Sequence, residues 1–372
     1  MSKHLHIVSF DIPYPANYGG AIDVFYKIKC LHEAGVQVIL HCFEYGDRKP
    51  SEELEKFCKK VYYYKRKMQF TNHFSFLPFN VKSRISKELK QNLLLDEYPI
   101  LFEVLHSAYL INDKSLVNRF KLFRPANIEH DYFLEIAKSE KSFFKKIYLK
   151  IEALKLKKFE SRISDAHIML PISKKDVRYF KKKYEHTQSV FFPAFHEFDE
   201  ISVRLGKGNY ILYHGNLSIS ENYTAAIWLI ENVFSKLKHQ VIIAGLNPPI
   251  FLQNLISKYD HISLKANCSS LEMKALISEA HINCLYTSQS TGLKLKLLNV
   301  LFSGRFVLAN SQMLVGSGLE KICDICNTPS EYLNAIDKMM NQSIDNSFIE
   351  NRKKGLVMMS NETKTEFLVS LL

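Results

Sequence analysis

Two series of short apolar runs, each followed by a segment of helical periodicity, extend along this chain. In the first series, an apolar run at Leu5–Phe10 leads through a turn-rich loop into helical spacing over Ala21–Ala34, and the next apolar run is Val36–Phe43. A strand, a helix and a strand in this order form a βαβ crossover, which implies a parallel sheet with helices on its faces. The chain is therefore predicted to be an α/β protein.

The remaining elements continue the same alternation. In the first half, further strands are predicted at Val61–Tyr64, Ile100–Leu105, Leu122–Asn127 and Ala166–Leu170, with helices near 82–95, 107–118, 141–165 and 174–184. In the second half, strands are predicted at Tyr210–His214, Gln240–Ala244, Ile262–Leu264, His281–Tyr286 and Phe306–Ala309, with helices at Asn222–Leu237, Pro249–Tyr259, Ser270–Glu279 and Leu293–Phe302. Each half is thus predicted to be a doubly wound, Rossmann-like domain, which binds ligands at the carboxyl ends of its strands.

A length of 372 residues suits two such domains, since domains usually hold about 100–200 residues each. The stretch 191–208 contains proline and glycines and is the predicted junction. We expect a first Rossmann-like domain over 1–196, a second over 205–355, and a last helix within 356–372 that packs back on the first domain. The two domains are expected to face a common cleft.

Charge is unevenly distributed between the halves. Residues 1–200 hold 34 Lys and Arg against 25 Asp and Glu, whereas residues 201–372 hold 16 against 13. Basic residues alternate with aromatic ones in 56–90, and 138–183 is again strongly basic. This pattern favours peripheral contact with an anionic membrane, although a solvated helix face over core aromatics would look similar. A nucleic-acid partner is not expected, because no nucleic-acid-binding motif accompanies the charge.

Cysteine usage and hydropathy indicate the compartment. The seven cysteines are odd in number and irregularly spaced, unlike a disulfide framework. Cys323 and Cys326 form a lone C-x-x-C pair, so no zinc site is predicted. The first residues lead straight into a strand and do not resemble a signal peptide, and no run reaches the roughly 18–20 apolar residues of a membrane span. The protein is expected to be cytoplasmic, in contact with the inner face of the cytoplasmic membrane at most.

Two junctions between a strand and a helix carry glycine. Gly19 and Gly20 follow the first strand, while Gly215 and Asn216 follow the first strand of the second half. Backbone N–H groups in such loops, together with a helix N-terminus, suit a phosphate. A plain chain turn, or an ordinary histidine at the strand end, would use the same residues.

A third junction, Ser290–Asn299, carries cations. Gly292 opens a helix whose first turns contain Lys294 and Lys296. Lysine there opposes the helix dipole unless an anion lies between them. Asn299 interrupts an otherwise apolar helix and needs a partner, which could be a ligand hydroxyl or a backbone carbonyl.

A polar cluster follows a strand end of the first half. Glu129, His130, Asp131 and Tyr132 are consecutive, and His106 closes the neighbouring predicted strand. Carboxylates beside an imidazole suit a general base or a site for sugar hydroxyls, while surface or capping roles remain open for each residue. D-x-D, G-x-S-x-G and Walker A sequences are all absent, which argues against metal–diphosphate, hydrolase and P-loop chemistry.

Together these motifs resemble retaining glycosyltransferases of the GT-B fold, similar to glycosyltransferase family four. Thr291–Gly304 resembles the "T-G-h-K-x-K-h-L-N/E-A-L-x-x-G-R" stretch of bacterial surface-polysaccharide transferases. Asn127–Tyr132 resembles their "H-N-h-E-x-x-Y-Y" segment, and Arg162–Asp176 their "h-x-x-A-D-x-h-h-x-I-S-x-x-D" segment.

The resemblance implies transfer of a hexose-type sugar, with retention and without a metal. It makes 1–196 the acceptor-side domain and 205–355 the nucleotide-sugar-binding domain. The co-substrate would be a nucleotide diphosphate sugar, no further cofactor is expected, and the acceptor would be a glycan or a lipid-linked hydroxyl in surface polysaccharide or lipopolysaccharide synthesis. The implied donor-binding residues are Gly19, Gly20, Gly215, Asn216, Thr291, Gly292, Leu293, Lys294, Lys296 and Asn299. The candidate catalytic residues are His130, Glu129 and Asp131, with His106 and Tyr132 on the acceptor side.

The chain departs from the family pattern at several positions. Thr291 and Asn299 stand where the family has two glutamates, and Asn216 and Glu221 stand where it has a phosphate-binding arginine and lysine. Compensation is expected from Lys294, Lys296 and Arg305 near the diphosphate and from His130 as the imidazole. These departures keep open a second hypothesis, a catalytically inactive GT-B protein that binds sugar or assists another transferase. A non-hydrolysing sugar epimerase of the same fold is a weaker third.

Overall fold

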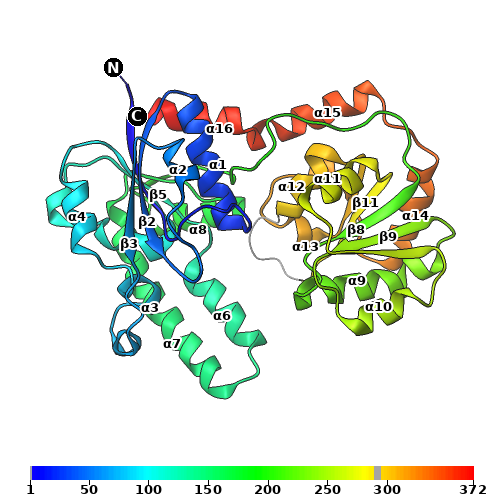
Figure 1. The fold of residues 1–372 in the computed structure, drawn as a ribbon, viewed down its shortest axis with the longest axis horizontal. Coiled ribbons are helices and arrows are strands. Elements are labelled where there is room, and N and C mark those ends of the chain that lie inside the picture. The colour runs from blue at the N-terminus through cyan, green and yellow to red at the C-terminus, as the bar shows by residue number, and fades with distance from the viewer. Residues whose placement is uncertain (1, 289–294) are drawn as a thin grey trace. The chain divides into compact units, whose positions relative to one another are not determined.

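A computed structural model describes residues 2–288 and 295–372. Contacts within the chain divide it into two compact units (Figure 1). Unit 1 comprises Met1–Glu197 with Asn361–Leu372, and unit 2 comprises Phe198–Ser360. Each unit is built on its own parallel sheet, so each has its own hydrophobic core.

Unit 1 contains a parallel sheet in the order β3-β2-β1-β4-β5-β6-β7. Its strands are β1 (His4–Val8), β2 (Gln37–Glu44), β3 (Lys60–Lys65), β4 (Ile100–Glu103), β5 (Lys121–Arg124), β6 (Ile168–Met169) and β7 (Gln188–Ser189). Its helices are α1 (Gly19–Glu33), α2 (Glu52–Glu55), α3 (Phe79–Lys82), α4 (Lys87–Leu93), α5 (Val104–Ser107), α6 (Glu129–Ser139), α7 (Phe143–Glu160), α8 (Lys174–Lys183) and α16 (Asn361–Leu371). Short 3-10 turns are η1 (Phe70–Phe74), η2 (Ala108–Leu110), η3 (Lys114–Leu116) and η4 (Ser161–Asp165).

Unit 2 contains a second parallel sheet in the order β10-β9-β8-β11-β12-β13. Its strands are β8 (Tyr210–His214), β9 (Gln240–Gly245), β10 (Ile262–Ala266), β11 (Ile282–Leu285), β12 (Phe306–Ala309) and β13 (Asp324–Ile325). Its helices are α9 (Ser220–Asn232), α10 (Ile250–Ile256), α11 (Ser270–Glu279), α12 (Leu295–Ser303), α13 (Ser311–Leu314), α14 (Pro329–Met340) and α15 (Asn346–Leu356). Its 3-10 turns are η5 (Phe234–Lys236), η6 (Glu320–Ile322) and η7 (Val357–Met359).

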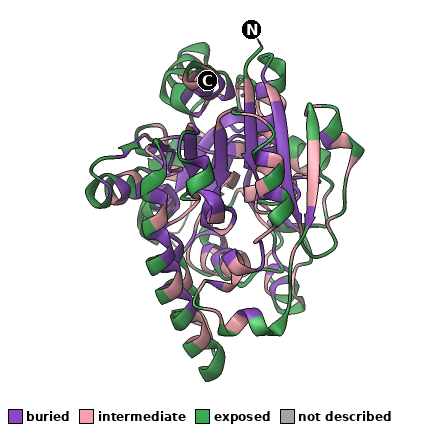
Figure 2. Ribbon diagram, turned by 90° about the vertical axis from the view of Figure 1, so that its left-hand side faces the viewer, coloured by how far each residue is buried: buried purple, intermediate pink, exposed green. Residues whose placement is uncertain are grey.

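The central strands of both sheets are buried on both faces, as apolar runs covered by helices on either side should be. Figure 2 shows the central strands of unit 1 in the colour of buried residues, with exposed residues on the outer helices and on the edge strand β3. In unit 1 the strand order reverses between β1 and β4, and in unit 2 between β8 and β11. Ligands of doubly wound sheets bind at such switch points, outside the carboxyl ends of the strands.

The predicted fold class, two doubly wound α/β units, is confirmed. Three predicted elements, Tyr210–His214, Ser270–Glu279 and Phe306–Ala309, have the observed bounds. The helix predicted over 107–118 is wrong, because the chain there forms only the end of α5 and the single turns η2 and η3. Asp113 interrupts it: its carboxylate accepts from the Ser115 N–H at 2.9 Å and starts a new turn, a local bond that competes with helix continuation.

A buried ionic network holds the carboxyl edge of the sheet in unit 1. Asp23 on α1 accepts from Arg124 Nη2 at 2.9 Å and from the Phe195 N–H at 2.7 Å. Lys27, one turn further along α1, donates to Glu103 at 2.5 Å. These side chains lie almost wholly out of solvent, so the network joins α1, β4, β5 and the stretch 192–196 through charges that need one another.

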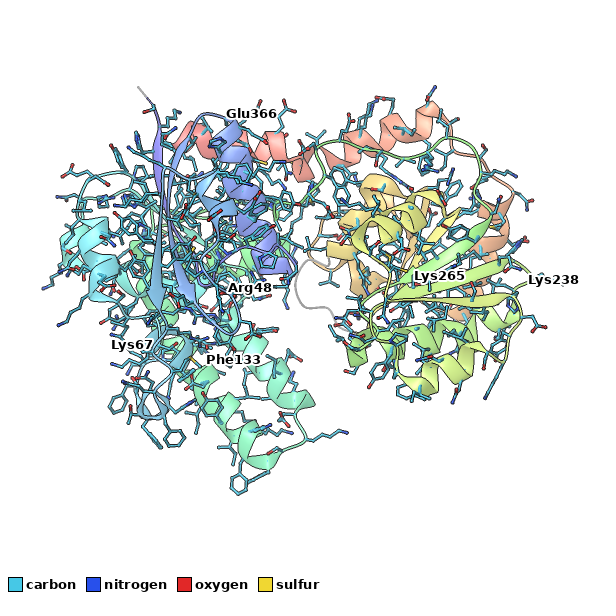
Figure 3. All side chains as sticks on the ribbon, viewed as in Figure 1. Arg48, Lys67, Phe133, Lys238, Lys265 and Glu366 are labelled. Carbon is cyan, nitrogen blue, oxygen red and sulfur yellow. The ribbon has the colours of Figure 1, made fainter. Side chains whose placement is uncertain are left out.

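The last helix, α16, is part of unit 1 and packs against α1. Lys364 points inward and donates to the Ala194 carbonyl at 2.6 Å, and the Asn361 side chain donates to the His196 carbonyl at 2.7 Å. Glu366 lies on the exposed side of the same helix (Figure 3). Burial, only partly offset by Asp23, lowers the pKa of Lys364 to about 7.

The stability of unit 1 is expected to rise with pH above neutrality because of Lys364. The unfolded chain holds the lysine proton up to about pH 10.4, whereas the folded chain releases it near pH 7. The unfolded state therefore binds more protons between these values, and the free energy of unfolding increases with pH across that window. One pKa unit is worth about 1.4 kcal/mol, so the gain is a few kcal/mol at most.

Thermal unfolding of the protein and of Lys364→Met between pH 6.5 and pH 10, roughly the window set by the two pKa values, measures this effect. The difference in melting temperature between the two proteins should shift in favour of the lysine protein as pH rises. A difference that stays constant across the range would show that Lys364 remains charged in the fold.

Candidate functional site

In unit 2, the loop after β8 lies against the end of β9. A Cβ atom on Gly245 would lie 1.8 Å from the Gly215 carbonyl oxygen. No side chain fits at that distance, so glycine at position 245 lets the two strand ends approach closely. The glycine therefore sets how closely the loop after β8 packs on the end of β9 at the carboxyl edge of this sheet.

His214, the last residue of β8, carries a buried polar atom. The residue is 5% exposed, and its Nε2 has no hydrogen-bond partner in the part of the chain that the structure describes. Burial, together with the nearby Lys296 cation, lowers the pKa of His214 to about 3, so the imidazole is neutral at pH 7. Buried polar atoms are nearly always paired in proteins, which makes Nε2 a position where a ligand would find a hydrogen bond.

Lys296 lies beside His214, near the described start of α12. Its Nζ donates to Asn222 Oδ1 at 3.1 Å and lies 5.7 Å from the centre of the Tyr213 ring. Asn222 in turn donates to the Asn216 carbonyl at 3.0 Å. The cation is thus held over the end of β8 by α9 and by the loop that precedes it.

A second set of polar contacts joins the ends of β11 and β12 to α9. The Thr287 hydroxyl donates to Glu221 at 2.5 Å, and the Asn310 side chain donates to the Thr287 carbonyl at 2.7 Å. Three strand ends and one helix N-terminus therefore present polar side chains at the carboxyl edge of this sheet. The neutral imidazole and the ammonium can bind a polar, anionic ligand, whereas the Glu221 carboxylate opposes an anion close to it.

The structure brings only some of the predicted donor residues to this edge. Gly215, Asn216 and Lys296 lie there. The predicted residues Thr291, Gly292, Leu293 and Lys294 lie outside the described residues. Asn299 is half-buried, and its side chain makes no hydrogen bond within the described part of the chain, so the partner expected for it is not found there.

Arg305 does not have its predicted role near a diphosphate. It precedes β12, at the amino edge of the sheet, and its Nη1 donates to the carbonyls of Ser278 and Glu279, each at 2.9 Å. These are the last carbonyls of α11, which lack partners within the helix. The guanidinium therefore closes a helix end.

In unit 1, Gly19 and Gly20 begin α1. A Cβ on Gly20 would lie 2.6 Å from Cζ of Phe10, so the glycine allows close packing. Tyr18 donates to Asp11 Oδ2 at 2.8 Å, and the Arg48 guanidinium lies 4.6 Å from the centre of the Tyr18 ring. The glycine loop is thus a packed, cation-flanked helix start, which agrees with both an anion-binding role and a structural turn.

The predicted cluster of acids and histidines does come together in unit 1. His106 Nε2 lies 3.3 Å from Glu129 Oε2, and His130 Nδ1 lies 3.3 Å from Glu160 Oε2. Both contacts fall short of hydrogen-bond geometry. Glu129 and His130 are buried, whereas the Asp131 side chain is 54% exposed. Glu129 and His130 can therefore orient neighbouring side chains, and Asp131 can contact a ligand that approaches from solvent.

Glu160 anchors this cluster from the end of α7. It accepts from the Tyr179 hydroxyl at 2.7 Å and from Lys183 at 2.5 Å. Burial raises the pKa of Glu160, but the adjacent His130 ring and the hydrogen bonds from Lys183 and Tyr179 outweigh burial and hold the pKa below its ordinary value. Glu160 is therefore a charged carboxylate that faces the His130 ring.

Asp176 belongs to the same cluster, although it was not among the predicted site residues. It lies in the first turn of α8, where its N–H donates to Ser173 Oγ at 3.1 Å. Burial, and after it the carboxylates of Asp131 and Glu129, raise the pKa of Asp176 to about 6. A sequence signal for Asp176 was present, since Asp176 is the last residue of the S-x-x-D ending in the segment Arg162–Asp176. In the fold, this ending lies beside residues 129–131.

Neither a cluster of metal ligands nor a membrane-spanning helix is present in residues 2–288 and 295–372. They contain no group of three or more His, Cys, Asp or Glu side chains arranged to hold a metal ion. None of their helices is long and apolar enough to cross a membrane.

Solved structures with the same two-unit architecture are glycosyltransferases of the GT-B fold. The sucrose-phosphate synthase of Thermosynechococcus elongatus superposes on 100% of this chain and 98% of its own, with a TM-score of 0.65 and 14% identity. A UDP-forming α,α-trehalose-phosphate synthase of Burkholderia xenovorans, in complex with glucose-6-phosphate, covers 99% of both chains with a TM-score of 0.58 and 11% identity. At such identities the likeness establishes the fold, and this chain has the GT-B fold.

One relative found by sequence comparison also has a known genomic setting. An uncharacterized 44.6 kDa protein in the cps region of Klebsiella pneumoniae is 30% identical over 338 residues, 84% of each chain. The chain belongs to the family of this cps-region protein. No model of a known protein family matches the sequence, and the resemblance to glycosyltransferase family four stays a prediction.

Proposed function

We propose that this protein is a glycosyltransferase of surface-polysaccharide synthesis. In this proposal it transfers a hexose-type sugar from a nucleotide diphosphate sugar to a hydroxyl of a glycan or lipid-linked acceptor, with retention and without a metal. The GT-B fold and the cps-region relative support the class. The observation that supports the proposal most is that the unpartnered Nε2 of His214, at the end of β8, lies near the Lys296 ammonium.

The donor is proposed to bind at the carboxyl edge of unit 2. Lys296 would lie next to the diphosphate, and the unpaired Nε2 of His214 would hydrogen-bond a polar group of the same ligand. When the sugar leaves, the diphosphate gains negative charge, and a fixed ammonium stabilises that charge more than it stabilises the bound donor. Thr291–Lys294 is predicted from the sequence to complete this site.

The acceptor is proposed to bind at the cluster of unit 1. Asp131 and Tyr132 are its exposed members and would contact the acceptor hydroxyl. Glu129 and His130 are buried, so their part would be to orient these two groups. With a pKa of about 6, Asp176 can hold or release a proton near neutral pH.

A thermal-shift screen against UDP-, GDP- and ADP-sugars tests the proposal. A donor that binds only the folded state raises its melting temperature, so one class of nucleotide should give a clear shift. Slow release of the nucleoside diphosphate from that donor should follow, because glycosyltransferases without acceptor transfer sugar to water. A flat screen would contradict the proposed function.

A second candidate is an inactive GT-B protein that binds sugar or supports another transferase. The observation that favours it is Glu221, which stands where the resemblance places a phosphate-binding lysine and is instead bonded to Thr287. A carboxylate there repels a diphosphate. Binding of a donor without any release of nucleoside diphosphate, even with acceptor extracts present, would select this candidate.

A further inference from the structure

Unit 1 exposes a row of apolar side chains along α7. Phe144, Ile147, Ile151 and Leu154 follow one another at spacings of three and four residues, so they lie on one face of the helix. Their exposed fractions range from 41% to 81%. We call this row the apolar stripe, and no element in the described part of the chain covers it. Figure 1 shows α7 and its neighbour α6 side by side, extending away from the sheet of unit 1.

A turn rich in phenylalanine lies next to the stripe. Phe70, Phe74 and Phe76, in and just after η1, are 75%, 77% and 96% exposed. We call residues 70–76 the aromatic turn. It is fixed to α7, because His73 Nδ1 bonds the Tyr148 hydroxyl at 2.9 Å and Lys155 donates to the His73 carbonyl at 2.9 Å.

The aromatic turn and the stripe form one continuous surface. Between them lies a cavity of about 610 Å³, lined mainly by Phe70, Phe74, Phe76 and Ile151. Large side chains of this kind are rarely left together in water on a protein without a partner. A surface of this size and composition therefore indicates that something apolar covers it.

The charges on α7 itself are almost all positive. Residues 141–158 contain seven lysines and a single acid, Glu152. Glu152 is buried and is paired with Lys155 at 2.8 Å and with the Phe79 N–H at 2.7 Å, so it does not offset the exposed charge. Lys67 lies on the strand side of the aromatic turn (Figure 3).

We propose that the aromatic turn and the apolar stripe insert into the surface of an anionic lipid bilayer. Phenylalanines and aliphatic side chains would enter the boundary between headgroups and acyl chains, and the flanking lysines would contact anionic headgroups. The combination of apolar insertion and basic charge supplies the two signals that stable peripheral binding requires. This inference does not depend on the proposed donor site in unit 2.

Two other partners fit less well. A single-stranded nucleic acid would bind the lysines through its phosphates and stack its bases on the phenylalanines. It would make no favourable contact with an aliphatic row such as Ile147, Ile151 and Leu154. A second copy of this chain would bring together two surfaces that carry the same positive charge, which opposes association. An anionic bilayer complements both the charge and the apolar character.

Vesicle co-sedimentation with the full chain tests the proposal. The probes are vesicles of phosphatidylcholine alone and of phosphatidylcholine mixed with phosphatidylglycerol. The protein should sediment with the mixed vesicles at low salt and at least tenfold less with phosphatidylcholine alone. Phe74→Ser/Phe76→Ser and, separately, Lys145→Gln/Lys150→Gln should each lower the partition coefficient about tenfold or more.

The matched control is Ile250→Ser/Leu271→Ser in unit 2, since these side chains are also 73% and 79% exposed. Its vesicle binding should equal that of the unaltered protein, and all variants should keep the same melting temperature. Equal binding to both kinds of vesicle, or no binding to either, would overturn the proposal. So would binding to single-stranded RNA that the phenylalanine variant loses, or a dimer in lipid-free solution that the same variant dissociates.

Discussion

Replacing Lys296 by methionine is expected to weaken binding of the nucleoside diphosphate roughly ten- to hundredfold. The ammonium is held by Asn222 and by the Tyr213 ring at the end of β8, so little ordering remains to be done when an anion binds. Loss of a hydrogen bond to a charged group costs about 1.5–3 kcal/mol, which sets this range. Calorimetric titration with UDP, GDP and ADP measures it, using whichever of them binds the unaltered protein.

Lys238→Met is the control for this experiment. Lys238 is an exposed lysine of the same unit that precedes β9, so it lies at the amino edge of the sheet, away from the end of β8 (Figure 3). The Lys238→Met variant should bind the nucleoside diphosphate with the same affinity as the unaltered protein. Equal affinities for all three proteins would place the anion elsewhere, and no binding of any of the three diphosphates would count against a donor site in unit 2.

Replacing Asp23 by asparagine is expected to destabilise unit 1 by about 3–5 kcal/mol, the usual cost of removing one partner from a buried ion pair. The asparagine has the same shape but leaves Arg124 and Lys27 without their shared anion, in a region with almost no access to water. Thermal or urea unfolding measures the loss, which should appear as a large drop in the melting temperature of unit 1.

Glu366→Gln is the matched control, because it also removes one carboxylate charge from unit 1 but at an exposed position of α16. Its stability should change by less than about 0.5 kcal/mol, as is usual for surface sites. If Asp23→Asn lowered the stability no more than Glu366→Gln does, water would have to reach Arg124. The buried network would then not stabilise the carboxyl edge of the sheet.

Much of the fold could be predicted because it depends on local patterns. Apolar runs and helical spacing gave the β8, α11 and β12 segments at their observed bounds, and the alternation of strand and helix gave two parallel sheets. The same reasoning failed at 107–118, where one aspartate side chain competes with the helix backbone.

The candidate site was less predictable, because its parts meet through space. Lys296 and its partner Asn222 are 74 residues apart in the sequence, and Thr287 and Glu221 are 66 residues apart. No spacing rule reveals such partners. Asp176 joined the cluster of unit 1 for the same reason. Arg305 was assigned to the wrong edge, although the predicted strand Phe306–Ala309 already placed it at the amino end of that strand.

The return of α16 to unit 1 has a consequence for how the chain folds during synthesis. Unit 2 is inserted, as one contiguous block, into the sequence of unit 1. Since domains usually fold as the chain emerges, unit 2 can complete its core while unit 1 still lacks Asn361 and Lys364. These two residues cover part of α1 and of the stretch 194–196. That surface therefore stays exposed until the whole of unit 2 has been translated.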